Sequence, residues 1–386
     1  MMGNFRRILA VALLSLFLAA CKIIPGGGSD RPQPTGPAVE QPSGPDIGLP
    51  TDETRHRVAL LVPLTGENAA VGQSIANATT MALLDTNADN LRITTYDTGP
   101  SAARAATRAI QDGNKLILGP LVRGNVSAVL GQARPVDVPI ITFSNDLSVA
   151  QPDVFVMGHA PEQSISRTVA FAMGKGARRF AALTPNGEYG DRAYAALRRA
   201  VEAGGGQVVA VERFDRGNRT IVNAADRLDA QGGFDTVLIA DGARLAALAA
   251  AELKAAGDAL PSIIGPELWS GESALAASPA MRGAWFSAVS DNRYRQFTQS
   301  YQTRFGNEPY RIATLGYDAV LLALRVARDW RVGRDFPTSE LTDPGGFLGL
   351  DGPFRFTRNG VGERAMEVRQ VGNGAVSVID AAPTQF

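Results

Sequence analysis

The chain is poor in the residues that build metal sites and disulfides. It has one cysteine and two histidines among 386 residues, so a zinc site of cysteine and histidine and a disulfide within the chain are both excluded. Charge of one sign is not in excess either, because 38 basic residues balance 38 acidic residues. This balance argues against nucleic acid as a partner. Hydrophobic residues make up 45% of the chain, which allows a sizeable core.

Sequence motifs of common enzymes are also missing. The chain has no G-x-x-x-x-G-K-[ST] motif, no G-x-G-x-x-G motif after a strand, no H-E-x-x-H motif and no G-x-S-x-G motif. A serine hydrolase without that last motif and a carboxylate-based enzyme are unsupported rather than excluded. We interpret His56 and His159 as structural residues. We therefore expect a protein that is not an enzyme and that uses no cofactor and no metal.

The N-terminus contains a short hydrophobic run that is typical of a signal peptide. Arg6 and Arg7 precede a largely apolar run of 13 residues, 8–20, which is too short for a stable membrane-spanning helix. The run ends Leu-Ala-Ala-Cys, which resembles the lipobox of bacterial lipoproteins. We predict a signal peptide over residues 1–20 and lipidation of Cys21. The alternative is an ordinary signal peptide that happens to contain a cysteine.

A tether follows the cysteine. Residues 25–50 contain seven prolines and six glycines and almost no large apolar side chains, so they cannot bury enough surface to fold. We therefore assign residues 21–55 to the lipidated cysteine and a Pro/Gly-rich tether. Lys22, rather than an aspartate, follows the cysteine, which favours the outer membrane over the inner membrane. The predicted location is periplasmic, with the chain anchored to the membrane by lipid.

The rest of the chain alternates between short apolar strands and amphipathic helices. This alternation is typical of an α/β fold with parallel sheets covered by helices on both faces. Strands are predicted at 57–62, 91–96, 115–118, 138–142, 154–158, 180–184, 207–213, 236–239 and 262–265. Helices are predicted at 73–85, 101–111, 126–133, 162–174, 189–203, 220–229 and 243–256.

The loops after these strands share one kind of chemistry. They are rich in glycine, proline and small polar residues, which suits a site for a small polar ligand at the carboxyl ends of parallel strands. The alternative is that they are ordinary turns and helix caps. The loops in question are 63–67, 119–124, 143–146, 185–191, 241–242 and 265–269.

Several short motifs resemble one known family when they are taken in order. They are Pro-Leu-Thr-Gly at 63–66, Ile-Leu-Gly-Pro at 117–120, Tyr-Gly-Asp at 189–191, Gly-Pro-Glu at 265–267 and Gly-Tyr-Asp-Ala at 316–319. Over residues 57–380 the chain resembles the type I periplasmic binding proteins of the leucine/isoleucine/valine-binding group. The resemblance implies two doubly wound parallel-sheet lobes, joined by three crossovers, with a ligand in the cleft. Lobe one is then 56–158 plus 290–334, and lobe two is 159–289 plus 335–386.

The resemblance also implies ligand-binding residues. Glu267 matches the glutamate that meets the ammonium of an amino-acid ligand, and Tyr189 matches an aromatic residue that covers the ligand. Arg123 stands where small hydroxyl residues are usual and could hold a carboxylate, which Asp146 would repel. Arg123 could instead bridge to Asp146, Asp241 or Glu267 and fill the cleft. The complete predicted set is Arg123, Ser144, Asn145, Asp146, Tyr189, Asp241 and Glu267.

Two functions fit this pattern. The first is a receptor that delivers an amino acid or a similar small polar ligand to the permease of an ABC importer. The second is an activator of penicillin-binding proteins in peptidoglycan synthesis, because outer-membrane lipoproteins of that kind carry a similar domain. The implied partners are a small polar ligand, the membrane through the lipid anchor, and either an ABC permease or a penicillin-binding protein.

Overall fold

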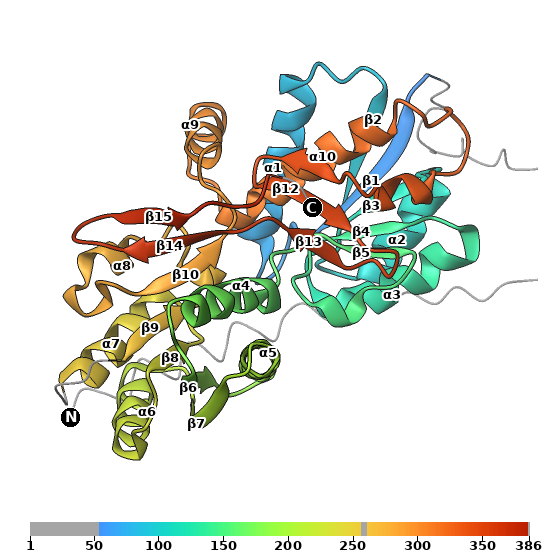
Figure 1. Cartoon of the computed structure of the whole chain (residues 1–386). Helices are drawn as coiled ribbons and strands as arrows, with labels where there is room; N and C mark the ends of the chain where they lie inside the picture. The colour runs from blue at the N-terminus through green and yellow to red at the C-terminus, as the bar shows by residue number, and fades with distance from the viewer. Residues whose placement is uncertain (1–53, 256–260, 385–386) are drawn as a thin grey trace, which may run out of the picture. The chain divides into compact units, whose positions relative to one another are not determined.

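The computed structural model describes residues 54–255 and 261–384. Its first sheet has five parallel strands in the order β2-β1-β3-β4-β5 (Figure 1). The strands are β1 His56–Val62, β2 Leu91–Asp97, β3 Leu116–Leu118, β4 Ile140–Thr142 and β5 Val154–Val156. The apolar run that predicted the first strand lies between β2 and β3 in this sheet and is buried on both faces.

Helices cover both faces of the first sheet and make lobe one. The helices α1 and α10 pack on one face, and α2 and α3 pack on the other. Helix α9 packs against α1 through Phe297 and Tyr301. These helices are α1 Ala69–Asp85, α2 Ala102–Gln111, α3 Arg123–Ala133, α9 Tyr294–Phe305 and α10 Thr314–Val326.

The second sheet has seven strands in the order β15-β14-β10-β9-β8-β6-β7 and forms the centre of lobe two. Five of its strands are parallel; β14 is antiparallel to β10 at their edge, and β15 is antiparallel to β14. The parallel strands are β6 Arg179–Pro185, β7 Gln207–Phe214, β8 Thr236–Ile239, β9 Ser262–Gly265 and β10 Trp285–Ala288. The hairpin strands are β14 Glu367–Val371 and β15 Val376–Asp380.

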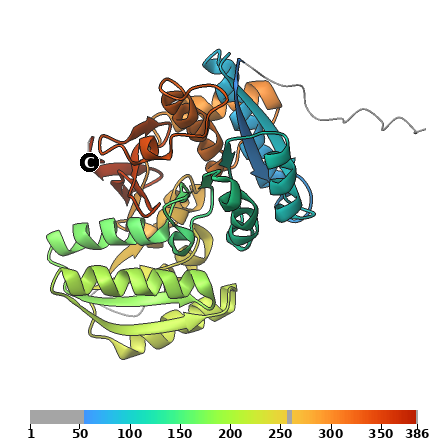
Figure 2. The same cartoon turned by 90° about the vertical axis from the view of Figure 1, so that its right-hand side faces the viewer.

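Helices also cover both faces of the second sheet. The helices α4 and α5 lie side by side on one face, as Figure 2 shows in green, and α6, α7 and α8 cover the other. They are α4 Pro161–Gly174, α5 Glu188–Ala203, α6 Asn218–Gln231, α7 Ala243–Ala255 and α8 Ser273–Ala277. All the strands and helices predicted from the sequence are present, with ends that differ by a few residues. The largest difference is at α1, which begins four residues before the predicted start at 73.

A small antiparallel sheet changes the predicted division between the lobes. It consists of β11 Phe347–Gly349, β12 Gly352–Phe356 and β13 Gly362–Arg364. The sequence-based division gave residues 335–386 to lobe two. In the structure Phe354 and Phe356 pack into the core of lobe one, together with Phe336 and Leu341. The final part of lobe two therefore starts near β14, because the aromatic side chains before it are buried against the first sheet.

The chain passes between the lobes three times, at 157–160, 289–293 and 365–366. Charged side chains tie these crossovers together around Asp351, which is fully buried. Its carboxylate lies 2.9 Å from His159 Nε2 and accepts hydrogen bonds of 2.8 Å from Arg311 Nη1 and from Thr314 Oγ1. Arg311 also lies 3.5 Å from Asp291, and Asp291 pairs in turn with Arg369. One continuous polar network thus links the first two crossovers to β14, the strand that follows the third crossover.

Candidate functional site

Tyr189 lies in the first turn of α5, directly after β6 ends. The helix can begin this close to the strand because residue 190 is glycine. A Cβ atom at Gly190 would lie 1.8 Å from the carbonyl oxygen of Pro185. A larger residue would push the start of α5 away from the sheet. The glycine therefore fixes where the ring of Tyr189 lies.

Glu267 begins the short 3-10 turn η3 Glu267–Trp269, which follows β9. Trp269 is fully buried beneath this turn, and its Nε1 donates a 2.8 Å hydrogen bond to the carbonyl oxygen of Asp241. Gly265 makes room for the indole, because a Cβ atom there would lie 2.2 Å from the ring. Trp269 thus joins the loop that carries Glu267 to the loop after β8.

The polar ends of Glu267 and Tyr189 have no hydrogen-bond partner. Both carboxylate oxygens of Glu267 and the hydroxyl of Tyr189 are buried, with no hydrogen-bond partner among the described residues. The Ser164 hydroxyl lies near Glu267, but it donates its hydrogen to the carbonyl oxygen of Ser287 at 2.8 Å. Burial raises the pKa of Glu267 to about 8; the nearby charge of Glu162 adds to this rise, and Arg192 opposes it. Burial, followed by the charges of Glu267 and Asp241, raises the pKa of the Tyr189 hydroxyl. Buried polar groups without partners are rare in proteins, and they often mark functional sites.

Arg192 connects the lobes next to Glu267. Its guanidinium forms two hydrogen bonds, of 2.8 and 2.9 Å, with the carboxylate of Glu162 on α4. It also donates a 2.5 Å hydrogen bond from Nη2 to the carbonyl oxygen of Asn145 in lobe one. We call the group of Asp146, Glu162, Tyr189, Arg192 and Glu267 the interlobe site.

Arg123 makes the second connection between the lobes. Its Nε lies 2.5 Å from the carboxylate of Asp146, as one of the sequence-based alternatives predicted. Its Nη1 lies 3.0 Å from the carboxylate of Glu188 in lobe two, a partner that the sequence did not indicate. Burial alone would raise the pKa of Asp146, but hydrogen bonds from Ser148 and the charge of Arg192 hold it below its ordinary value.

The other predicted residues have local contacts. The hydroxyl of Ser144 accepts a hydrogen bond from the backbone N–H of Asp146, and Asn145 contributes its carbonyl oxygen while the residue is exposed. Asp241 is buried and lies 3.0 Å from Arg216 Nε. Arg216 also lies over the ring of Tyr189, 5.9 Å from its centre.

Sequence reasoning missed several charged residues of this region. A usable signal existed for two of them, because Glu162 and Glu188 lie in the first turns of helices that follow strands: α4 follows β5 of lobe one, and α5 follows β6 of lobe two. The missed residues are Glu162, Glu188, Arg192 and Arg216.

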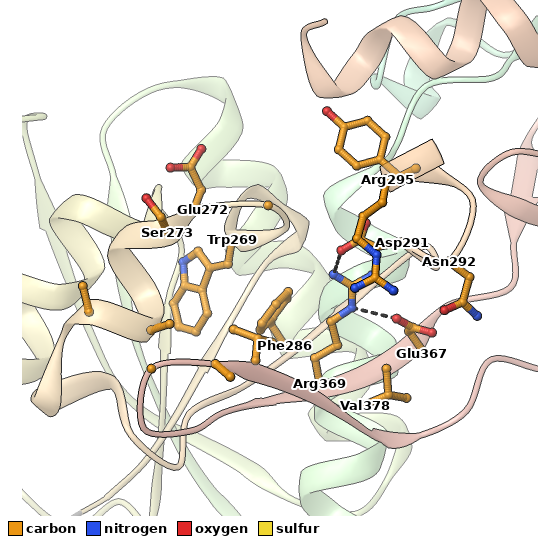
Figure 3. A pocket seen from close by; sticks show the side chains of 17 residues that line it. Trp269, Glu272, Ser273, Phe286, Asp291, Asn292, Arg295, Glu367, Arg369 and Val378 are labelled. Carbon is orange, nitrogen blue, oxygen red and sulfur yellow. Dashed lines mark hydrogen bonds and ion pairs between the residues drawn. The ribbon is translucent and has the colours of Figure 1, made fainter. Parts of the chain in front are cut away.

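A separate cavity of about 810 Å³ lies between the β14–β15 hairpin, α8 and the start of α9 (Figure 3). Phe286 and Trp269 line one part of it, while Arg369, paired with Asp291 and Glu367, lines another. None of the seven predicted site residues lines this cavity. Since Trp269 also supports the loop of Glu267, one side chain contacts both regions.

Residues 54–255 and 261–384 lack two further features. No group of three or more histidine, cysteine, aspartate or glutamate residues there could hold a metal ion. No helix of that part has both the length and the apolar character needed to span a membrane. Cys21 and the predicted tether lie outside the described residues.

Two kinds of protein are similar to this chain in sequence. An uncharacterized protein of Rickettsia prowazekii is 32% identical over 134 residues, which cover 34% of this chain and 36% of that protein. The penicillin-binding protein activator LpoA of Pantoea ananatis is 28% identical over 128 residues, which cover 33% of this chain and 19% of that protein. The chain thus matches only about a third and a fifth of the length of these two relatives.

Solved structures show the same fold over a larger share of the chain. A protein of Rhodospirillum rubrum, assigned as a branched-chain amino acid ABC transporter, has a TM-score of 0.76 and 24% identity, covering 84% of this chain and 100% of that one. Full-length LpoA of Haemophilus influenzae has a TM-score of 0.66 and 19% identity, covering 86% and 60%. A family model described as periplasmic binding protein matches residues 56–375. The chain therefore belongs to the periplasmic binding protein family, with the type I fold of its leucine-binding group.

Proposed function

We propose that the chain is a non-catalytic periplasmic protein that binds a small polar ligand with an ammonium group between its lobes. The observation that carries this proposal is the pair of buried, unpartnered groups on Glu267 and Tyr189. A ligand ammonium could donate to the carboxylate of Glu267, and such charge-assisted hydrogen bonds are among the stronger ones in proteins. The ligand would then satisfy polar atoms that the protein leaves without partners.

A receptor for an ABC importer is the role that this binding supports first. The Rhodospirillum rubrum structure with the same fold is assigned to branched-chain amino acid transport. Closing two lobes on a ligand is a known way for such receptors to signal to a permease. The two connections made by Arg123 and Arg192 would be part of the closed arrangement.

Binding of small ammonium compounds by the purified full chain tests this proposal. The Glu267→Gln variant keeps the shape of the side chain and removes its charge, so we expect its affinity to fall at least tenfold, about 1.4 kcal/mol. Glu202→Gln is the matched control, because the Glu202 side chain on α5 is 63% exposed and belongs to no interlobe contact. Isothermal titration calorimetry measures the affinity of the wild type and of both variants. Equal affinity in Glu267→Gln and in the wild type would contradict the proposed site.

Activation of penicillin-binding proteins is the second candidate, and two observations favour it. The lobes are already connected by the chain's own side chains, through Arg123 to Glu188 and Arg192 to Asn145. Curated relatives from Pantoea ananatis and Photobacterium profundum are named as activators of penicillin-binding proteins. An activator would act through a surface that faces its protein partner, and the interlobe site could then serve stability alone.

An experiment in cells separates the two roles. The double variant Tyr189→Ala/Glu267→Ala is compared with the wild type and with a deletion strain, after its unchanged folding has been confirmed. For a receptor we expect loss of ligand uptake with normal resistance to β-lactams. Unchanged uptake, together with β-lactam hypersensitivity in the deletion strain alone, would favour the activator.

The location belongs to the same proposal. The family is one of periplasmic proteins, which supports a periplasmic location for the folded part. We propose in addition that Cys21 carries a lipid and that the residues up to 55 connect it to lobe one. An outer-membrane anchor is proposed on the basis of Lys22, the residue after the cysteine.

A further inference from the structure

Among the described residues around the interlobe site, carboxylates outnumber guanidinium groups. Five carboxylates are found there, those of Asp146, Glu162, Glu188, Asp241 and Glu267, and they face the three guanidinium groups of Arg123, Arg192 and Arg216. The imbalance is not spread evenly. Each of the first four carboxylates has an arginine partner within 3.0 Å, and Glu267 has none.

All three guanidinium groups are already engaged with carboxylates. Arg192 is held on two sides, by the carboxylate of Glu162 and by the carbonyl oxygen of Asn145. Arg216 pairs with Asp241 and lies over the ring of Tyr189. Among the described residues of this region, no arginine is therefore left to receive an anionic group of a ligand.

Arg123 is the decisive residue for an amino-acid ligand, because sequence reasoning offered it as a holder of the ligand carboxylate. The structure gives its guanidinium two carboxylates of the protein instead, Asp146 at 2.5 Å and Glu188 at 3.0 Å. A ligand carboxylate would have to displace one of them. It would also come close to the remaining negative charges, and like charges brought together in a buried site disfavour binding.

We propose that the interlobe site selects a small primary amine, or a similar organic cation, that carries no carboxylate, over an amino acid of the same shape. This inference rests on the proposed function, since it names the ligand class of the same site. The ammonium meets Glu267, and the Tyr189 hydroxyl accepts one of its hydrogens or donates to a second polar atom of the ligand. The protein's own carboxylates occupy the positions that a ligand carboxylate would need.

Matched pairs of amino acids and amines test the inference on the purified full chain. The probes are leucine, leucinamide and 3-methylbutylamine, and lysine with 1,5-diaminopentane. Leucinamide keeps the ammonium and the shape of leucine and removes the negative charge. We expect at least one amine to bind tenfold or more tightly than its parent amino acid, and leucinamide to bind more tightly than leucine, as measured by isothermal titration calorimetry.

A second variant tests whether the pairing of Arg123 with Asp146 causes the preference for amines over amino acids. Asp146→Asn removes a negative charge beside Arg123 and keeps the side-chain oxygen that accepts the hydrogen bond from Ser148. In this variant the preference for 3-methylbutylamine over leucine should narrow by about tenfold, because Arg123 becomes available to a carboxylate. Thermal melting of both proteins shows whether the variant is folded.

The outcomes separate this inference from the proposed function. Tighter binding of leucine or lysine than of the matched amines, with loss of binding in Glu267→Gln, would overturn the inference and leave the proposed function standing. Binding that is equal in the wild type and in Glu267→Gln would overturn both. Failure of every probe to bind would also count against both, because the panel spans both ligand classes.

Discussion

Replacing Asp351 by asparagine is expected to lower the free energy of unfolding by about 3 kcal/mol or more. The Asp351 carboxylate is fully buried. Its oxygens lie 2.8–2.9 Å from the polar side-chain atoms of His159, Arg311 and Thr314. Asparagine removes the negative charge. The buried guanidinium of Arg311 then has one carboxylate partner left, that of Asp291 at 3.5 Å. Breaking a buried ion pair from one side is strongly destabilising because the other charge stays buried.

Guanidinium-induced unfolding, followed by tryptophan fluorescence, measures this effect. Trp330 reports on lobe one, whereas Trp269 and Trp285 report on lobe two. Asp343→Asn is the control, because Asp343 is 39% exposed and lies 3.9 Å from the exposed Arg325. It should change stability by less than about 1 kcal/mol. A similar, small change in both variants would show that the network around Asp351 contributes little to stability.

Replacing Glu267 by glutamine is expected to stabilise the ligand-free protein, and the gain should grow as the pH rises. The pKa of Glu267 is raised to about 8 in the folded protein, mainly by burial, whereas in the unfolded chain it has its ordinary value near 4.5. Between these two values unfolding releases a proton, so the stability of the wild type falls with rising pH by up to about 1.4 kcal/mol per pH unit. Above pH 8 both states are ionised and the fall ends.

Melting curves of the two proteins between pH 5 and pH 9 measure this difference. The glutamine variant lacks the titrating group, so its melting temperature should exceed that of the wild type by several degrees at pH 8 and by little at pH 5. The charged and titratable groups around Glu267 are unchanged in the variant; they are Glu162 on α4, Tyr189 and Arg192 on α5, and Asp241 after β8. Equal pH dependence in both proteins would show that Glu267 does not titrate in this range.

The same titration bears on ligand binding. An ammonium binds the ionised form of Glu267, so affinity should rise as the pH increases from 6 to 8. The protein would thus trade stability for binding at one residue, as functional sites often do. The gain in stability of Glu267→Gln and its loss of affinity are separate results of removing one buried charge.

Local patterns were sufficient to predict most of the fold. The apolar runs at 57–62 and 180–184 are strands because a strand buried on both faces must be apolar throughout, and this signal is contained within a few residues. The order of strands and helices then indicated parallel sheets, and the resemblance to the periplasmic binding proteins implied that there are two of them. The predicted lobe boundary at 335 was wrong for Phe354 and Phe356, because an aromatic residue does not carry the information of which sheet it will pack against.

The candidate site divides in the same way. The sequence by itself determined which loops follow the parallel strands and therefore contribute to the site. A resemblance in short motifs then indicated Tyr189 and Glu267. Only the tertiary structure decided the charge pairing: Arg123 takes Asp146 and Glu188, Arg192 takes Glu162, and Glu267 is left alone. These partners come from loops and helices tens of residues apart, whose approach depends on how two sheets are packed and joined. The hydrophobic periodicity of a segment indicates which of its faces is buried. It contains no information on which distant side chains meet.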